Sequence, residues 1–220
     1  MHIPDGMISL GACAIGYVAS GALTSYSLNK IRKSHNPSKD ITRIALGTAV
    51  FFTATLISIP VPPASVHPIL AGLCGISLGI YAPAAILVSL FFQAILFSHG
   101  GLSTLGVNAL ILSLPALLGW KVHETLYRYV KRNPVSTWCL GFLNGIISSG
   151  LAISFFAIVI TLFMPSYIDA EAEKYSLIIL ITAHIPLLLV ESAITGFAAN
   201  YIERFTFYKQ SEYGKSDTLC

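Results

Sequence analysis

Two histidines in this sequence stand where they could bind a transition metal ion. His2 directly follows Met1, so the amine of Met1, the backbone nitrogen of His2 and its imidazole could close two fused chelate rings around one ion. Such a nearly planar nitrogen set suits Ni(II) and Cu(II) first. His67 is the best candidate for a fourth nitrogen, because we expect it in a second segment on the same face of the protein. The alternative is that His2 is an ordinary interfacial residue ahead of a helix.

Two further histidines, His99 and His184, are expected at or near that same face. His99 begins the turn HGGLST, and His184 lies inside a predicted membrane segment. Four histidines that converge on one side of a helical bundle indicate a metal site, although each alone could be a capping or packing residue. The remaining two, His35 and His123, fall in basic connections and are expected to be solvated.

Glu191 is the only acidic residue inside a predicted membrane segment. It follows His184 by seven positions, which places both on nearly the same face of a helix. An acid within a membrane by default marks a binding site or pathway. The alternative is a buried acid that holds helices together through hydrogen bonds to Ser192, Asn108 or Asn144.

The elements that must position these residues are membrane helices. Of the 220 residues, 55% are hydrophobic and 10% are charged, against roughly 25% charged in soluble domains. We therefore predict an all-α membrane protein with about seven transmembrane helices in one domain, residues 1–202, followed by a short tail, residues 203–220. The predicted helices are Met7–Leu28, Ile44–Ile59, Pro68–Tyr81, Pro83–Ser98, Thr104–Lys121, Val135–Met164 and Ser176–Ile202.

The charges predict the orientation. Twelve of the thirteen basic residues fall in the first connection, the fifth connection and the tail. Basic residues favour the cytoplasmic side, so we expect the N-terminus outside, inserted into the bundle, and the C-terminus inside. The outer face then carries Asp5, Asp169, Glu171 and Glu173, where a cation would arrive. The net charge of +3 is too small to indicate nucleic acid.

Prolines interrupt the outer connection that contains His67. The stretch IPVPPASVHP cannot form a continuous helix, because proline lacks a backbone donor and restrains the preceding residue. Irregular backbone at membrane depth is tolerated where protein or a wet cavity covers it. We expect this stretch to fold over or into the outer mouth of the bundle.

Four stretches of the chain resemble the CbiM/NikM family: MHIPDG at the start, SVHP at 65–68, QAILFSHGGLSTLGVN at 93–108 and HIPLLLVESAIT at 184–195. These proteins are the substrate-specific (S) membrane components of energy-coupling factor (ECF) importers for cobalt and nickel. The resemblance implies a seven-helix bundle with the N-terminus inserted, and Met1, His2 and His67 as metal ligands. It implies supporting positions at Asp5, His99 and Asn108, and less defined supporting roles for His184 and Glu191.

The same resemblance implies how the protein would work. The bound substrate would be Co(II) or Ni(II), with a slight lean to cobalt and no organic cofactor. The chain would not be an enzyme; ATP hydrolysis would occur in cytoplasmic ATPase (A) subunits, joined by a coupling transmembrane (T) subunit and in some cases a small accessory membrane protein. The location would be the lipid bilayer of the cell (inner, cytoplasmic) membrane, as a multi-pass protein.

Two other classes of function remain open and rank well below the importer. An intramembrane hydrolase would use Ser148 or Ser149 with His184, although the stretch GIISSG carries no clear nucleophile signature. An ion channel would be lined by His184 and Glu191, and would conduct without an ATPase.

Overall fold

The computed structural model describes residues 2–61, 64–131 and 133–216. These residues form seven α-helices, one short 3-10 helix and one two-stranded hairpin. In chain order the elements are α1 (Leu10–Arg32), α2 (Pro37–Thr55), β1 (Ile59–Val61), β2 (Ala64–Val66), α3 (Ala71–Leu78), η1 (Gly79–Tyr81), α4 (Ala82–Phe97), α5 (Leu105–Tyr127), α6 (Pro134–Phe163) and α7 (Ala170–Ser216).

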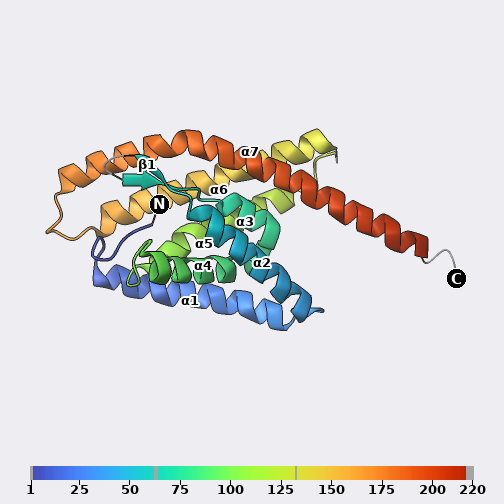
Figure 1. The fold of residues 1–220 in the computed structure, drawn as a ribbon, viewed down its shortest axis with the longest axis horizontal. Coiled ribbons are helices and arrows are strands. Elements are labelled where there is room, and N and C mark those ends of the chain that lie inside the picture. The colour runs from blue at the N-terminus through green and yellow to red at the C-terminus, as the bar shows by residue number, and fades with distance from the viewer. Residues whose placement is uncertain (1, 62–63, 132, 217–220) are drawn as a thin grey trace.

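The helices pack around α5. It contacts α1, α3, α4 and α6, while α7 lies along α6 on the outside of the bundle. Figure 1 shows α1 on one side of the molecule and the α6–α7 pair on the other. Each of the seven predicted segments overlaps an α-helix, but the prediction was that all seven cross a membrane.

Four helical stretches are long and apolar enough to cross a membrane: Ala71–Phe97, Leu105–Tyr127, Pro134–Phe163 and Glu171–Phe205. The first of these joins α3, η1 and α4, so the two predicted segments that meet at Ala82–Pro83 follow one another without a gap. The structure is therefore that of a helical membrane protein.

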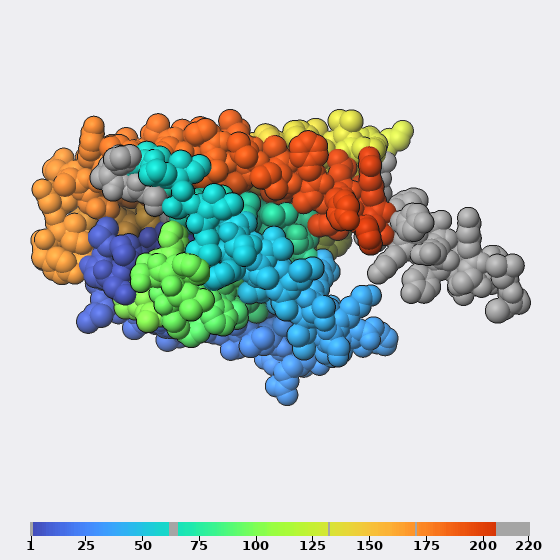
Figure 2. All heavy atoms as spheres, viewed as in Figure 1, coloured from blue at the N-terminus to red at the C-terminus, as the bar shows by residue number. Residues whose placement is uncertain are grey.

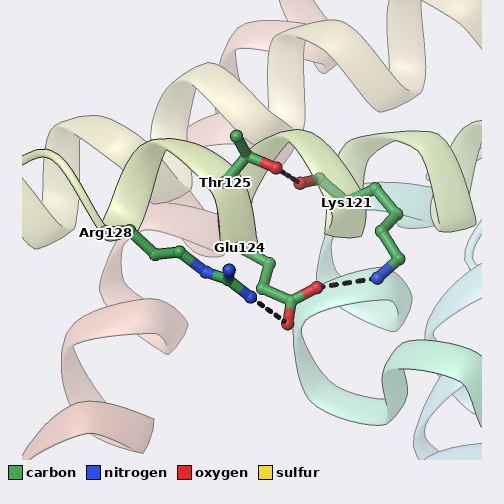
Figure 3. A network of polar contacts seen from close by, with 4 residues as sticks. All are labelled: Lys121, Glu124, Thr125 and Arg128. Carbon is green, nitrogen blue, oxygen red and sulfur yellow. Dashed lines mark hydrogen bonds and ion pairs between the residues drawn. The ribbon is translucent and has the colours of Figure 1, made fainter.

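The connections between the helices lie at two opposite ends of the molecule. In Figure 1 the α1–α2 and α5–α6 connections lie at the end toward which the C-terminus extends, and the hairpin and the α6–α7 connection lie at the other end. Figure 2 shows the N-terminal residues beside the hairpin and the end of α4 at this second end. The basic end is also ordered by ion pairs: Glu124 accepts from Lys121 at 2.9 Å and from Arg128 at 3.3 Å, as drawn in Figure 3.

The proline-rich stretch forms the hairpin, which confirms that it is not a continuous helix. β1 and β2 pair antiparallel, with Ile59 opposite Val66 and Val61 opposite Ala64. Pro60 is compatible with this pairing because each strand of a two-stranded ribbon has a free edge. The hairpin delivers the chain directly to His67.

Glycines allow the helices beneath this end to approach closely. A Cβ added at Gly75 would lie 2.3 Å from the carbonyl oxygen of Ala116 in α5, and one added at Gly145 would lie 2.5 Å from the Cα of Ser192 in α7. Both distances are far below contact distance, so a larger residue would push the helices apart. The close approach of α6 and α7 lets buried polar groups on the two helices meet.

Candidate metal centre

Three imidazoles meet at the end of the molecule that holds the N-terminal segment. His2, His67 and His99 each offer one ring nitrogen, and these nitrogens lie within 4.8 Å of one another. The ring centroids are 4.5 Å apart for His2 and His67, 5.0 Å for His2 and His99, and 4.9 Å for His67 and His99. The structure thus brings together three of the four histidines predicted for this face.

Each of these rings has at least one nitrogen that no described residue contacts by a hydrogen bond. Both ring nitrogens of His2 and the Nε2 atoms of His67 and His99 are buried and have no hydrogen-bond partner in the described part of the chain. The Nδ1 of His67 lies 3.2 Å from the carbonyl oxygen of Pro68. A carbonyl only accepts, so Nδ1 carries the proton and Nε2 keeps its lone pair. Buried polar atoms without a partner are costly, which favours an occupant for the site.

Burial favours the neutral form of two of these imidazoles, those of His2 and His99. Burial lowers the pKa of His2 well below its ordinary value, and the proximity of His99 adds to this effect. Burial also lowers the pKa of His99. Neutral imidazole is the form that binds a metal ion, so both rings are available as ligands at neutral pH.

The backbone of Ile3 fixes the N-terminal segment beside the imidazoles. The N–H of Ile3 donates to Oδ1 of Asn108 at 2.8 Å, and its carbonyl accepts from Nδ2 of Asn108 at 3.0 Å and from Oγ1 of Thr104 at 2.6 Å. The side chain of Ile3 is fully buried. Asn108, predicted as a supporting residue, therefore holds the residue next to His2.

Asp5 anchors the same segment to the start of α5. Its carboxylate accepts from the N–H of Ser103 at 2.8 Å, from the N–H of Leu102 at 3.3 Å and from the Ser103 hydroxyl. These hydrogen bonds, that from the Ser103 hydroxyl foremost, lower the pKa of the Asp5 carboxyl, although its burial acts in the opposite direction. Asp5 thus contacts the turn after His99.

Two glycines in that turn make room for the N-terminal segment. Gly100 has a φ of +84°, and a Cβ there would lie 3.2 Å from the Cβ of His2. A Cβ at Gly101 would lie 2.2 Å from Oδ1 of Asp5 and 2.5 Å from its backbone nitrogen. A side chain at either position would displace the segment that carries His2.

Glu191 holds the backbone that follows His67. Its carboxylate accepts from the N–H of Ile69 at 2.7 Å, from the N–H of Leu70 at 3.0 Å and from the Ser149 hydroxyl at 3.0 Å. Leu70 has a φ of +50°, so this sharp bend needs such fixing. The prediction of Ser192, Asn108 or Asn144 as partners is wrong: those residues bond elsewhere, and Glu191 reaches across to the chain at His67.

His184 is buried but lies outside the three-imidazole group. Its Nδ1 lies 2.8 Å from the carbonyl oxygen of Leu180, and its Nε2 has no partner in the described part of the chain. Among the described residues, no hydrogen bond joins it to Ser148 or Ser149, whose hydroxyls donate to Asn144 and Glu191. In the described part of the chain, His184 is therefore not paired with either serine.

Gln93 is a site residue that the sequence reasoning missed. It is fully buried, its Nε2 donates to Thr55 Oγ1 at 2.6 Å, and its Oε1 has no partner in the described part of the chain. The backbone carbonyl oxygen of Gln93 accepts a hydrogen bond from the N–H of His99 at 3.1 Å, which fixes the turn that carries the His99 imidazole. The available signal was a lone amide in the apolar helix α4. Met1, predicted as a ligand through its amine, lies outside the described residues.

Comparison with known proteins gives a consistent picture. Residues 2–207 match the CbiM family, described as the cobalt uptake substrate-specific transmembrane region. The chain is 30% identical to a cobalt transport protein CbiM of Streptococcus sanguinis over 214 residues, covering 92% of this chain and 84% of that protein. It is also 30% identical, over 154 residues, to a fused nickel transport protein NikMN of Rhodobacter capsulatus, covering 69% of this chain and 42% of that longer protein. A crystal structure of a transition metal transporter has the same fold, with a TM-score of 0.75, 24% identity and 93% of each chain covered.

Proposed function

The chain belongs to the CbiM family, and we propose that it is the substrate-binding membrane component of an importer for divalent cobalt or nickel ions. The observation that carries this proposal is the group of three imidazoles with unpartnered, buried nitrogens at one end of a membrane bundle. Neutral imidazole nitrogens suit first-row transition metals and do not suit Mg(II) or Ca(II). The ion is the cargo of the protein.

We propose Met1, His2 and His67 as ligands of the ion. Met1 contributes its amine, His2 its backbone nitrogen and imidazole, and His67 its Nε2. The free Nε2 of His67 and the docking of Ile3, which fixes the neighbouring backbone of His2, support this assignment. The distance of 4.5 Å between the ring centroids of His2 and His67 also fits two adjacent ligands on one ion.

The proposed topology has seven membrane crossings, with the N-terminus outside and the C-terminus in the cytoplasm. The clustering of the basic connections at the end opposite the imidazoles supports it. The ion is captured at the outer end. A coupling membrane subunit and cytoplasmic ATPases of the ECF type, with a small accessory membrane protein in some assemblies, then drive the reorientation that exposes the ion inside. Loss of contact between the N-terminal segment and His67 releases it.

Calorimetric titration of the purified protein, with Met1 as its first residue, tests this function. We expect stoichiometric binding of Co(II) or Ni(II) without turnover, and loss of binding in His67→Asn and in a variant with one residue added before Met1. The exposed His35 provides the matched control, since His35→Asn should bind as the wild type does. Absence of binding in the wild type would refute the proposal, and full binding by the extended variant would refute the amine ligand.

A further inference from the structure

An apolar groove lies between α1, α2 and α4, apart from the candidate metal centre. It has a volume of about 560 Å³, and none of the three imidazoles lines it. Its walls include Leu28 and Ile31 of α1, Ile41 and Phe52 of α2, and Val88 of α4. Ile41 is 56% exposed and Val88 is 44% exposed. Large apolar side chains that remain exposed along one groove indicate a binding surface for an apolar partner.

The groove offers no free hydroxyl to a polar ligand. Among the residues that line it, Thr48 and Ser89 carry the polar side chains. The Ser89 hydroxyl donates to the carbonyl oxygen of Thr48 at 3.0 Å, and the Thr48 hydroxyl donates to the carbonyl oxygen of Ile44 at 2.8 Å. Each hydroxyl has one proton to donate, and both protons are used within the helices. The groove therefore suits an apolar chain along its length.

The length of the groove matches one leaflet of a bilayer. Phe52 follows Ile41 by eleven positions in α2, so the lining extends over about 16 Å at a rise of about 1.5 Å per residue. The hydrocarbon core of a bilayer is about 30 Å thick, so one leaflet contributes about 15 Å. At the end farther from the α1–α2 connection, the ring of Phe52 lies 5.9 Å from the ring of Phe97. An extended acyl chain from one leaflet fits this length.

Basic side chains lie at the other end of the groove, where α1 ends and α2 begins. Arg32 follows Leu28 by four positions, which places both on one face of α1. Lys33 caps that helix, and Lys39 lies in the first turn of α2, two positions before Ile41. All three basic side chains are exposed, and no ion pair joins them to an acid in the described part of the chain. An anionic group is the complementary partner for this end of the groove.

The acid of this connection does not neutralise the basic side chains. The carboxylate of Asp40 accepts from the Ser34 hydroxyl and, at 3.3 Å, from the Tyr81 hydroxyl. Two neutral donors therefore hold it, and the three positive charges remain available to a ligand.

We propose that this groove binds an anionic phospholipid, with one acyl chain along α2 and the phosphate group against Arg32, Lys33 and Lys39. Basic pockets between membrane helices on the cytoplasmic side bind anionic headgroups, and the cytoplasmic leaflet follows from the proposed orientation. An apolar helix of another membrane protein would not use the charged end of the groove, so the charges favour a lipid. The lipid joins α1 to α2 at the end of the molecule opposite the imidazoles.

Native mass spectrometry of the detergent-purified protein tests the headgroup. The probes are dioleoyl phosphatidylglycerol, which is anionic, and dioleoyl phosphatidylcholine, which has the same chains and no net charge. We expect one bound phosphatidylglycerol, with about 10-fold higher affinity than phosphatidylcholine, and loss of this preference in Arg32→Gln/Lys33→Gln. Arg128→Gln/Lys131→Gln is the control, since it removes two charges from the other basic connection at the same end, and it should keep the preference.

Substitution of Ala45 by phenylalanine tests the acyl chain. Ala45 is an exposed residue of α2 that lines the groove, so a phenyl ring there would occupy the space of the chain. Both lipids should bind about 10-fold more weakly, because the displaced methylenes lose their burial. Ala14→Phe is the matched control. Ala14 is an exposed alanine of α1 that does not line the groove, so this variant should bind both lipids as the wild type does.

Three results would overturn the proposal. The first is equal affinity of the wild type for the two lipids. The second is loss of phosphatidylglycerol binding in Arg32→Gln/Lys33→Gln with none in Ala45→Phe, because the lipid would then be held at the surface and not in the groove. The third is a wild-type dimer that Ala45→Phe dissociates with lipid binding unchanged, which would identify a second copy of the chain as the occupant. Circular dichroism checks that each variant is folded.

Discussion

At the scale of single residues, the N-terminal segment depends on Asn108. This side chain donates to the carbonyl of Ile3 and accepts from its N–H, so one amide satisfies both polar groups of a fully buried residue. Thr104 reaches only the carbonyl. The position of His2 is therefore fixed by a residue that does not itself belong to the imidazole group.

Replacement of Asn108 by alanine should weaken metal binding while leaving the helices folded. The N–H of Ile3 would lose its partner, and the freed segment would no longer hold His2 in place. We expect affinity for Co(II) or Ni(II) to fall by about 10- to 100-fold, the usual cost of losing a residue that orients a ligand. Calorimetric titration measures it. Asn200→Ala is the control, since Asn200 also donates to a backbone carbonyl, that of Pro134, but on an exposed part of the bundle; equal losses in both variants would contradict the assignment.

The lowered pKa values of His2 and His99 determine the pH dependence of binding. A proton and the ion compete for each ring nitrogen, and burial makes protonation of these rings harder than in a free histidine, whose pKa is about 6.5. Affinity should therefore fall as the pH decreases, with the steepest decline of the imidazole contribution below about pH 6.5. Titrations at a series of pH values would measure this, with circular dichroism as the check on folding. Affinity that stayed constant as the pH fell through the whole range in which the protein remains folded would exclude nitrogen ligands.

Some residues of the candidate site could be predicted from their chemistry, and others could be found only from the structure. His2 could be identified from the sequence as a candidate ligand, because the proposed chelate requires a residue next to the amine of Met1. The proximity of the His99 ring to the rings of His2 and His67 follows from the turn at Ser98 and from the space left by Gly100. The residue types alone do not predict this proximity. Gln93 was missed because a single amide in an apolar helix has many equivalent explanations.

At the scale of elements, Glu191 links the long helix α7 to the segment that carries His67. Its carboxylate accepts three hydrogen bonds, two of them from the N–H groups of Ile69 and Leu70. The residue is almost fully buried. Any movement of α7 relative to α3 must therefore act on the backbone next to a proposed ligand.

Glu191→Gln should weaken metal binding without removing the helix. The glutamine amide keeps one acceptor oxygen, but its NH2 group would face groups that are themselves donors. At least one donor to residue 191 would therefore lose its acceptor, which destabilises the folded protein by about 1–3 kcal/mol. We expect roughly 10-fold lower metal affinity and faster hydrogen exchange at Ile69 and Leu70. Glu203→Gln on the same helix is the control, since Glu203 accepts from Tyr127 and Thr137 instead. Affinity equal to that of the wild type in Glu191→Gln would show that the link does not hold His67.

The helices themselves followed from apolar composition and proline positions. Each predicted segment overlaps an α-helix, and the break at Pro60, which lies in β1, was foreseen from the missing backbone donors of proline. The ends were less well predicted: α2 begins at Pro37 within a charged stretch, and α7 extends from Ala170 to Ser216. Charged residues are compatible with helix beyond a membrane, so hydropathy alone does not mark where such a helix ends. The hairpin pairing depends on tertiary contacts that hydropathy does not report.

At the scale of the whole molecule, the two ends differ in chemistry. One carries the basic connections and the Glu124 ion pairs, and the other carries the imidazoles. The proposed orientation predicts that a cysteine at Glu171, an exposed position in the first turn of α7, reacts with a membrane-impermeant maleimide added to intact cells. A cysteine at the exposed His35 should react only after the membrane is opened. The test requires a background in which Cys139 and Cys220 are replaced by serine; the reverse pattern of labelling would invert the topology.

The three imidazoles come from three separate stretches of chain: the N-terminal segment, the segment after the hairpin and the connection between α4 and α5. An ion bound by all three would be a cross-link as well as a cargo. It would close two chain loops at once, and it would stabilise the folded protein in proportion to the logarithm of ion concentration above its dissociation constant. The loaded and empty proteins would then differ in stability at the end that carries the imidazoles, and Glu191 connects that end to the long helix α7.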